Sequence, residues 1–125
     1  MDSKKLIVVV DDDKTLCDLI KEILESEPEY QAMAVYDGRR ALDLIRSLNR
    51  SMPPNLVLLD VRMPGLNGLQ LYDILQSDDA TCEIPIIFVT ANSDSAAFRS
   101  HHIDNYIAKP FETSELLNRV AAALD

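Results

Sequence analysis

The sequence predicts an α/β protein in which helices cover both faces of a five-stranded parallel sheet. Three observations support this: short apolar runs alternate with segments of helical periodicity, several runs are apolar at every position, and no repeat or linker interrupts the 125 residues. Parallel strands buried on both faces have such unbroken apolar runs, and alternating strands and helices build a doubly wound sheet. A chain of this length can bury a core, so we expect one domain over residues 1–125.

The expected elements follow one another in a regular order, and each strand is an apolar run bounded by polar or turn residues. In chain order, the expected strands are Leu6–Val10, Gln31–Val35, Leu56–Leu59, Ile86–Val89 and Asn105–Ala108. Apolar residues at helical spacing predict helices that contain Leu16–Leu24, Ala41–Leu48, Leu69–Leu75 and Leu116–Leu124, and a short polar helix is expected at Ser93–His101. Asp37-Gly38 indicates a turn and cap before the second helix, and Thr113 is expected to cap the last one.

Polar side chains suited to phosphate or metal chemistry follow four of the five expected strands. They are Asp11 and Asp12 after the first strand, Asp60 after the third, Thr90 after the fourth and Lys109 after the fifth. The carboxyl ends of parallel strands meet at one edge of the sheet, where open α/β folds bind ligands. We therefore expect these side chains to share one crevice.

The carboxylates gathered at this edge repel one another. Two unit charges about 6 Å apart at an effective dielectric of about 20 repel by roughly 3 kcal/mol. Lys109 offsets part of this charge, and an oxygen-binding dication such as Mg²⁺ would offset the rest. A carboxylate can attack a phosphoryl group to form an acyl phosphate, while a metal ion, an ammonium group and a hydroxyl stabilise the transferred oxygens. The set therefore predicts a phosphoryl-accepting site.

Composition and charge exclude several other classes. The formal net charge of −9 argues against a nucleic-acid surface and against binding to an anionic membrane. No apolar run approaches the ~20 residues of a membrane-spanning helix, and the first residues lack a secretory pattern. Cys17 and Cys82 lie far apart without a metal-binding or redox motif, which is typical of reduced thiols. These features indicate a cytoplasmic protein.

Four segments of the chain carry motifs in a fixed order. They are Val8–Asp13, Leu58–Gly68, Val89-Thr90-Ala91 and Lys109-Pro110-Phe111, and the most specific is the Asp-x-x-Met-Pro-Gly-x-x-Gly pattern within the second. In this order and spacing they resemble the receiver domain of two-component response regulators, and the resemblance spans the whole chain. It implies a flavodoxin-like sheet with strand order 2-1-3-4-5 and five helices.

The resemblance also implies a reaction and its site. Asp60 would accept a phosphoryl group from a histidine kinase or a phosphotransfer protein, in a signalling domain that assists its own phosphorylation and dephosphorylation rather than an enzyme. The ligands of Mg²⁺ would be Asp11, Asp12, Asp60 and the backbone carbonyl of Arg62. Lys109 would pair with a phosphoryl oxygen, and its bond to the following proline would be cis.

The resemblance assigns the switch to two residues on neighbouring strands. Thr90 would bind the phosphoryl group when it moves inward, and Tyr106 would swing inward with it. The fourth helix, fifth strand and fifth helix would then form the output surface for an effector domain or a second copy. The segment Asn92–His102 departs from the family pattern, because it is about a turn of helix shorter. Its adjacent histidines, His101 and His102, would point about 100° apart on a helix and are expected at the surface.

Two alternatives from other classes remain open. The run from Asp11 to Thr15 fits the Asp-x-Asp-x-Thr pattern of haloacid-dehalogenase-like phosphatases, with Asp11 as nucleophile and Asp13 as acid and base. This alternative leaves Asp60 and its loop unexplained, and Asp13 could instead favour the N-terminus of the first helix. The other alternative is a binding-only domain of the same fold, against which the complete set of polar residues argues.

Overall fold

The computed structural model contains a sheet of five parallel strands. It describes residues 4–48, 52–91, 98, 100, 101, 103 and 105–125. The strands are β1 (Lys5–Val10), β2 (Tyr30–Val35), β3 (Leu56–Leu59), β4 (Ile86–Thr90) and β5 (Tyr106–Ala108). Their order in the sheet is β2-β1-β3-β4-β5, and each pair is parallel. The expected fold class and the strand order implied by the resemblance are confirmed.

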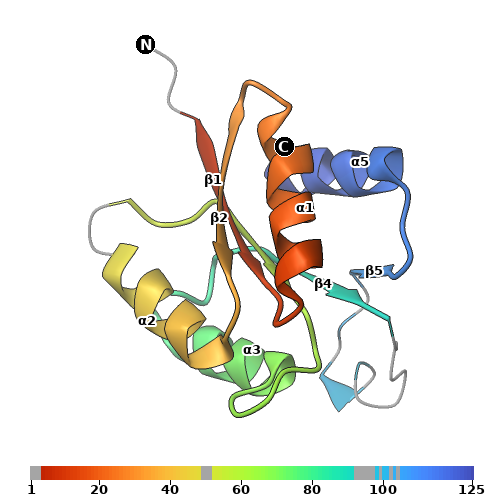
Figure 1. Ribbon diagram of the computed structural model, residues 1–125. Coiled ribbons are helices and arrows are strands. Elements are labelled where there is room, and N and C mark those ends of the chain that lie inside the picture. The colour runs from red at the N-terminus through yellow and green to blue at the C-terminus, as the bar shows by residue number, and fades with distance from the viewer. Residues whose placement is uncertain (1–3, 49–51, 92–97, 99, 102, 104) are drawn as a thin grey trace.

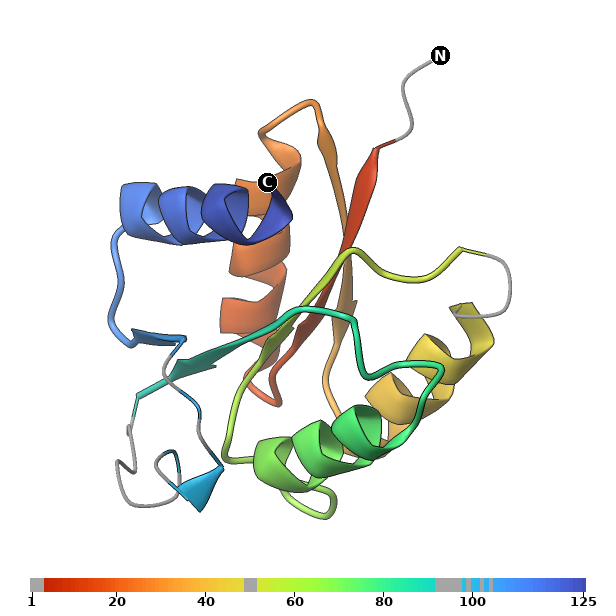
Figure 2. The same ribbon diagram turned by 180° about the vertical axis from the view of Figure 1, so that it is seen from behind.

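Helices cover both faces of the sheet. Within the described residues they are α1 (Lys14–Glu25), α2 (Gly38–Leu48), α3 (Gly68–Ser77) and α5 (Thr113–Leu124). Figures 1 and 2 show α1 and α5 on one face of the sheet and α2 and α3 on the other. The fourth expected helix, at Ser93–His101, falls largely outside the described residues. Of the described helices, none is long and apolar enough to cross a membrane.

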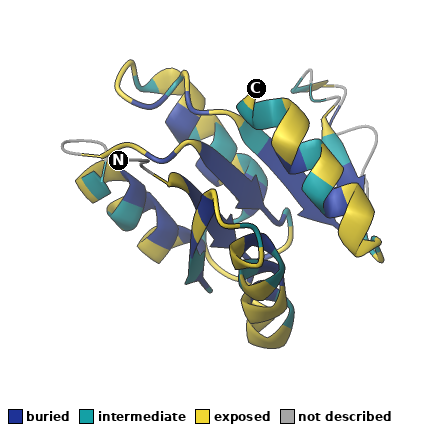
Figure 3. Cartoon of the chain, turned by 90° about the horizontal axis from the view of Figure 1, so that it is seen from above, coloured by how far each residue is buried: buried dark blue, intermediate teal, exposed yellow. Residues whose placement is uncertain are grey.

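The central strand β1 divides the core into two layers. Ile7 and Val9 pack with the buried side chains of α1 and α5, whereas Val8 and Val10 pack with those of α2 and α3. Successive side chains of a strand point to opposite faces, which explains this alternation. Figure 3 shows largely buried strands beneath helices whose outer sides are exposed. Burial on both faces is therefore the physical reason for the unbroken apolar run in the sequence.

Two aspartates cap helix N-termini, and the cap expected at Asp37-Gly38 is confirmed. Asp13 caps α1, because its Oδ1 accepts the N–H of Leu16 at 3.1 Å. The Asp37 side chain likewise accepts an N–H in the first turn of α2 at 2.9 Å. The expected cap at Thr113 is wrong, because Thr113 is already the first residue of α5. The N-cap is Glu112, whose backbone is extended (φ −90°, ψ 150°) and whose side chain makes no capping hydrogen bond.

Candidate functional site

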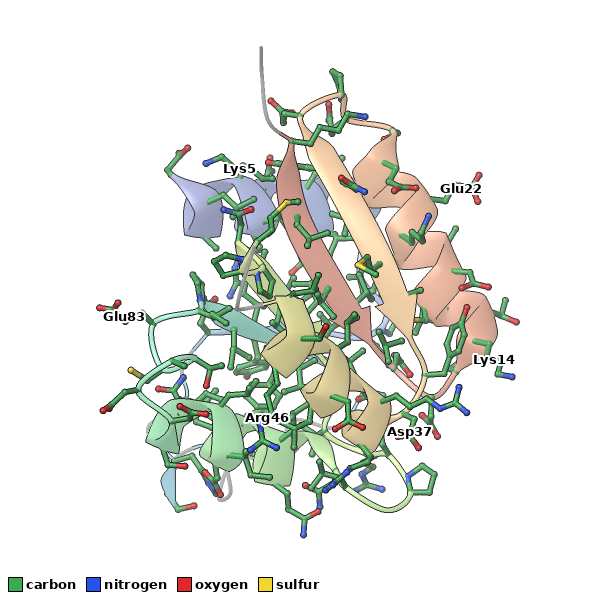
Figure 4. The ribbon with its side chains drawn as sticks, turned by 90° about the vertical axis from the view of Figure 1, so that its left-hand side faces the viewer. Lys5, Lys14, Glu22, Asp37, Arg46 and Glu83 are labelled. Atoms are coloured by element: carbon green, nitrogen blue, oxygen red, sulfur yellow. The ribbon has the colours of Figure 1, made fainter. Side chains whose placement is uncertain are left out.

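The carboxyl ends of the strands lie together at one edge of the sheet. Figure 4 shows Lys14, the first residue of α1, and Asp37, which directly precedes α2, at the end of the sheet opposite Lys5. The backbone pairing of β1 with β3 continues one residue beyond β3, since the N–H of Asp60 donates to the carbonyl of Val10 at 3.0 Å. Side chains that follow different strands are thereby brought close together.

Three carboxylates gather at this edge. Asp11, Asp12 and Asp60 each offer an oxygen atom, and these atoms lie within 4.8 Å of one another. Asp11 and Asp60 are only 2% and 7% exposed, whereas Asp12 is exposed. Carboxylate oxygens at this spacing are suitable ligands for a hard divalent cation.

Lys109 places a positive charge beside the two buried carboxylates. Its Nζ donates to Oδ2 of Asp11 at 2.7 Å and lies 3.6 Å from Oδ2 of Asp60. Oδ1 of Asp11 accepts the N–H of Asp13 at 3.0 Å, so both oxygens of Asp11 have partners. The bond between Lys109 and Pro110 is cis, as the resemblance implies.

The environment of Asp60 favours its protonated form relative to a carboxylate in water. Burial and the neighbouring Asp11 charge raise the pKa of Asp60 to about 6. Lys109 and a hydrogen bond from the backbone of Arg62 act in the opposite direction and limit the rise in this pKa. An additional cation at this position would favour the ionised form, because it would offset the same repulsion.

Thr90 and Tyr106 lie on the neighbouring strands β4 and β5. Thr90 is the last residue of β4 and is 1% exposed, and Tyr106 is the first residue of β5 and is half-buried. The register pairs Thr90 with Ala108 and pairs Tyr106 with Phe88. Thr90 therefore lies at the carboxyl edge of the sheet, whereas Tyr106 is two positions back along the strands. The ring of Tyr106 packs against Phe98, with 5.1 Å between centroids.

The loop that follows β3 forms one wall of the site. Its backbone at Arg62 contacts the Asp60 carboxyl through the hydrogen bond described above. Gly65 adopts φ 73°, a left-handed conformation that costs glycine little. Asn67 ends the loop and caps α3, and Gln70 completes the capping box. A groove of about 440 Å³ beside the loop is lined by Asp12, Val61, Arg62, Met63, Pro64 and Asn67.

Sequence reasoning does not identify two features near the site. Asn67 lines the groove and caps α3, and the pattern Asn67-x-x-Gln70 is the signal that could have found it. Leu19 belongs to the apolar stripe of α1, yet it is 48% exposed. The buried face of α1 is narrower than its apolar stripe, because it is formed by Cys17, Ile20 and Leu24.

Neither the cysteines nor His101 belongs to the acidic cluster in the described part of the chain. Cys17 is buried and Cys82 half-buried, and both are free thiols, in agreement with the expectation. His101 lies at the surface, as expected, with 26% of its side chain exposed, and its Nε2 lies 3.2 Å from Oδ2 of Asp73 on α3. His102 falls outside the described residues.

Comparison with known proteins identifies the family. Residues 7–121 match the family model for the response regulator receiver domain. The chain belongs to this receiver domain family. The receiver domain is 36% identical over 124 residues to the DNA-binding response regulators MtrA of Mycolicibacterium paratuberculosis and Mycobacterium leprae, covering 97% of this chain and 52% of each relative. It thus spans about half the length of the curated relatives that it matches.

Solved structures share the fold of this receiver domain. The Francisella response regulator 1452 receiver domain matches with a TM-score of 0.80 at 27% identity, covering 97% of both chains. A CheY-like response regulator receiver domain protein from Methanospirillum hungatei matches with a TM-score of 0.82 at 27% identity, covering 98% of this chain and 95% of that one. The chain is therefore a signalling domain of the two-component type.

Proposed function

We propose that this receiver domain, over residues 1–125, accepts a phosphoryl group on Asp60 in a Mg²⁺-dependent reaction. The observation that carries the proposal is the cluster of Asp11, Asp12 and Asp60 beside Lys109. The phosphoryl donor is a phosphohistidine on a histidine kinase or a phosphotransfer protein, as membership of the family suggests. The domain acts as a phosphoacceptor in signalling and not as an enzyme with a separate substrate.

The reaction begins at an oxygen of the Asp60 carboxylate. This oxygen forms a bond to phosphorus while the bond from phosphorus to the donor nitrogen breaks, and the nitrogen keeps the electron pair. The product is an acyl phosphate on Asp60 and a free imidazole on the donor. The Lys109 ammonium lies 3.6 Å from Asp60, which supports its assignment as the partner of a transferred oxygen. The Thr90 hydroxyl would donate to another of these oxygens.

The side chains present fit a Mg²⁺ ion. Asp11, Asp12 and Asp60 would supply carboxylate oxygens, and Arg62, whose backbone contacts Asp60, would supply its carbonyl. When bound, the ion offsets negative charge on the carboxylates and on the transferred oxygens. Lys109 alone carries one positive charge against three carboxylates, so the site has a charge imbalance that a dication would correct.

We assign the conformational response to Thr90 and Tyr106. Phosphorylation adds negative charge and acceptor oxygens near the end of β4, which favours an inward position of Thr90. Tyr106 on the adjacent strand would move with it and change the surface formed by β5, α5 and the residues between β4 and β5. An effector domain or a second copy would bind there. The net charge of −9 favours a protein partner over direct contact with nucleic acid.

An apolar groove next to Lys109 supports a docking site for the phosphodonor protein. The groove has a volume of about 390 Å³ and is lined by Leu16, Leu19, Ile23, Ala91, Lys109, Pro110, Phe111 and Thr113. Leu19 and Met52 are the large hydrophobic side chains most exposed in the described part of the chain. Because Lys109 lines this groove and also lies beside Asp60, a protein that covers Leu19 would bring its phosphohistidine near the acceptor.

Labelling by acetyl phosphate tests the acceptor. With Mg²⁺, the intact mass of the wild type should increase by one phosphoryl group, and Asp60→Asn should abolish the increase because the amide lacks the anionic nucleophile. The matched control Asp13→Asn should still be labelled, because Asp13 caps α1. If Asp11→Asn abolishes labelling while Asp60→Asn does not, the phosphatase alternative is correct. A wild type that neither becomes labelled nor binds beryllofluoride would indicate the binding-only alternative.

Transfer from a protein donor tests the docking groove. Leu19→Asp should slow transfer from a phosphorylated histidine donor roughly tenfold or more, since a charge would occupy the centre of an apolar contact. Its labelling by acetyl phosphate, which needs no docking, should match the wild type. Met52→Asp is the control, because it changes an even more exposed apolar residue outside the groove. Equal transfer rates for both variants and the wild type would exclude this groove as the donor site.

A further inference from the structure

Two glycines lie unusually close to the segment that begins at the proposed phosphoacceptor. Gly38 is the first residue of α2, Gly68 is the first residue of α3, and both are buried. A β-carbon on Gly38 would lie 2.1 Å from the carbonyl oxygen of Leu66, and one on Gly68 would lie 2.0 Å from the carbonyl oxygen of Asp60. Both separations are far below the roughly 3.5 Å of a favourable contact. The atoms in the way are backbone atoms, so no side-chain rotation could relieve the overlap.

The two glycines contact opposite ends of the loop after β3: Gly68 lies against its start at Asp60, and Gly38 lies against Leu66 near its end. Gly68 belongs to the loop motif itself, and its N–H donates to the carbonyl of Val61 at 2.9 Å, which closes the base of the loop. Gly38 comes from a different helix and is remote in sequence from every residue of the acidic cluster. Its contact with Leu66 is the point at which α2 meets the loop backbone. The side chain of Leu66 also packs against the core layer that contains α2 and α3.

The loop between these contacts has little freedom to absorb a displacement. Pro64 fixes one backbone angle, and Gly65 turns the chain at φ 73°. The side chain of Met63 is 7% exposed and packs in the core layer beneath the loop. A shift of Leu66 would therefore be transmitted toward Arg62, whose backbone contacts Asp60.

We propose that Gly38 is a positioning residue for the metal and phosphoryl site. Its missing side chain lets α2 approach Leu66 and holds the loop so that the backbone of Arg62 faces Asp60. This proposal rests on the function proposed for Asp60. Gly38 touches neither the metal nor the phosphoryl group and acts only through the loop.

The variant Gly38→Ala tests the proposal through Mg²⁺ binding. Its affinity for Mg²⁺, measured by titration of amide signals, should fall roughly tenfold or more, as expected when support behind a metal ligand is lost. The metal-free signals of Arg62 and Leu66 should also shift. Ile45→Val is the matched control, because Ile45 lies on the same helix about two turns beyond Gly38 and is fully buried. It should lower thermal stability while leaving Mg²⁺ affinity within twofold of the wild type.

A purely structural role for Gly38 gives a different result. If Gly38→Ala is less stable but binds Mg²⁺ as tightly as the wild type, the proposal is overturned while the function proposed for Asp60 stands. A wild type that binds no Mg²⁺ would instead overturn the proposed function. A further measurement needs no variant: Mg²⁺ binding to the wild type should shift the amide signal of Gly38, because coupling between two positions is reciprocal. An unchanged Gly38 signal at saturating Mg²⁺ would overturn the proposal even if Gly38→Ala does not fold.

Discussion

At the scale of single residues, Asp11 shows how the chain accommodates a buried charge. One of its oxygens accepts the N–H of Asp13 and the other accepts the Lys109 ammonium at 2.7 Å. A buried carboxylate with two such partners is far less costly than an isolated one. Asp60 has weaker compensation, since Lys109 lies 3.6 Å from it and its pKa is raised to about 6. The residue proposed to react is therefore the less well compensated of the two buried carboxylates.

Removing a negative or a positive charge from this site should change stability in opposite directions. Asp12→Ala should raise the free energy of unfolding in metal-free buffer by roughly 0.5 kcal/mol, a small effect because Asp12 is exposed and screened. Lys109→Ala should lower it by roughly 2–4 kcal/mol, because a buried ion pair loses one partner. Asp12→Ala should bind Mg²⁺ less well, because it loses a proposed ligand of the ion. Lys109→Ala should be labelled less by acetyl phosphate, because it loses the proposed partner of a transferred oxygen. Thermal unfolding with and without EDTA measures both changes in stability.

The exposed pair of Lys21 and Glu25 provides the control for these two variants. Lys21→Ala breaks a surface salt bridge of 2.8 Å and should cost less than about 1 kcal/mol. If Lys109→Ala is no more destabilising than Lys21→Ala, the ion pairs of Lys109 with Asp11 and Asp60 do not stabilise the fold. If Asp12→Ala is destabilised without metal and binds Mg²⁺ normally, Asp12 has a structural role instead.

At the scale of elements, β2 forms one edge of the sheet. A side chain of α1 occupies one of the backbone N–H groups that β2 would otherwise leave unpaired at this edge. The N–H of Ala32 donates to Oε2 of Glu25 at 3.1 Å, and the other oxygen of Glu25 accepts Lys21 at 2.8 Å. Side chains that occupy outward-facing backbone groups protect an edge strand from pairing with another chain. One glutamate therefore joins α1 to the edge of the sheet.

This edge contact should depend on pH in a defined direction. The hydrogen bonds from Lys21 and from Ala32 lower the pKa of Glu25 in the folded state. A carboxyl group with a lowered folded pKa adds stability at neutral pH, and this stability is lost as the pH falls through the folded pKa. Glu25→Gln should therefore be less stable than the wild type at pH 7, by under about 1 kcal/mol because the site is exposed. The difference should shrink toward pH 3 in urea unfolding.

A matched variant isolates the contact with β2. Glu22 lies on the same helix and accepts no backbone hydrogen bond from β2 among those the described residues show, so Glu22→Gln should leave stability at pH 7 nearly unchanged. A pH-independent difference between Glu25→Gln and the wild type would show that the charge of Glu25 is irrelevant to the contact.

At the scale of the whole molecule, the sheet joins groups that lie far apart in the sequence. Asp11 and Lys109 are 98 positions apart and form a direct hydrogen bond. On the face of the sheet that α2 and α3 cover, four aromatic rings form a continuous row with 5.1 to 5.5 Å between neighbouring centroids. The rings belong to Tyr106, Phe98, Phe88 and Tyr72. This row leads from the proposed switch residue to α3.

Replacing Thr90 should separate phosphorylation from its consequences. Thr90→Ala should still be labelled on Asp60, because Asp60 is the nucleophile, but beryllofluoride should no longer shift the amide signals of Tyr106 and Tyr72. The physical reason is that the alanine offers no hydroxyl to follow the phosphoryl group. Amide spectra recorded with and without beryllofluoride measure the response.

Another buried threonine provides the control for this experiment. Thr81 is 2% exposed, and its hydroxyl donates to the carbonyl of Leu75 at the end of α3. Thr81→Ala should lower stability while keeping the response at Tyr106. Undiminished shifts at Tyr106 in Thr90→Ala would show that the two residues are not coupled, and the assignment of Asp60 would remain.

Local patterns in the sequence were sufficient to predict the described strands and helices and the polar side chains that follow the strands. The run Leu6–Val10 is apolar at every position because β1 is covered on both faces, and this constraint is visible in the sequence itself. Asp13 caps α1 through a residue three positions away, which is also a local interaction. The parallel order of the strands then places Asp11, Asp60 and Lys109 at one edge without further information.

Features that depend on contacts between distant elements were decided only by the tertiary structure. Leu19 fits the apolar stripe of α1, but the packing of α1 leaves it exposed beside Phe111, in a groove formed with the loop after β5. Gly38 looks like an ordinary turn glycine, and its contact with Leu66 exists only because α2 packs against the loop after β3. Periodicity reports which side of a helix is apolar, whereas the position of each neighbouring backbone depends on how all the elements pack at once.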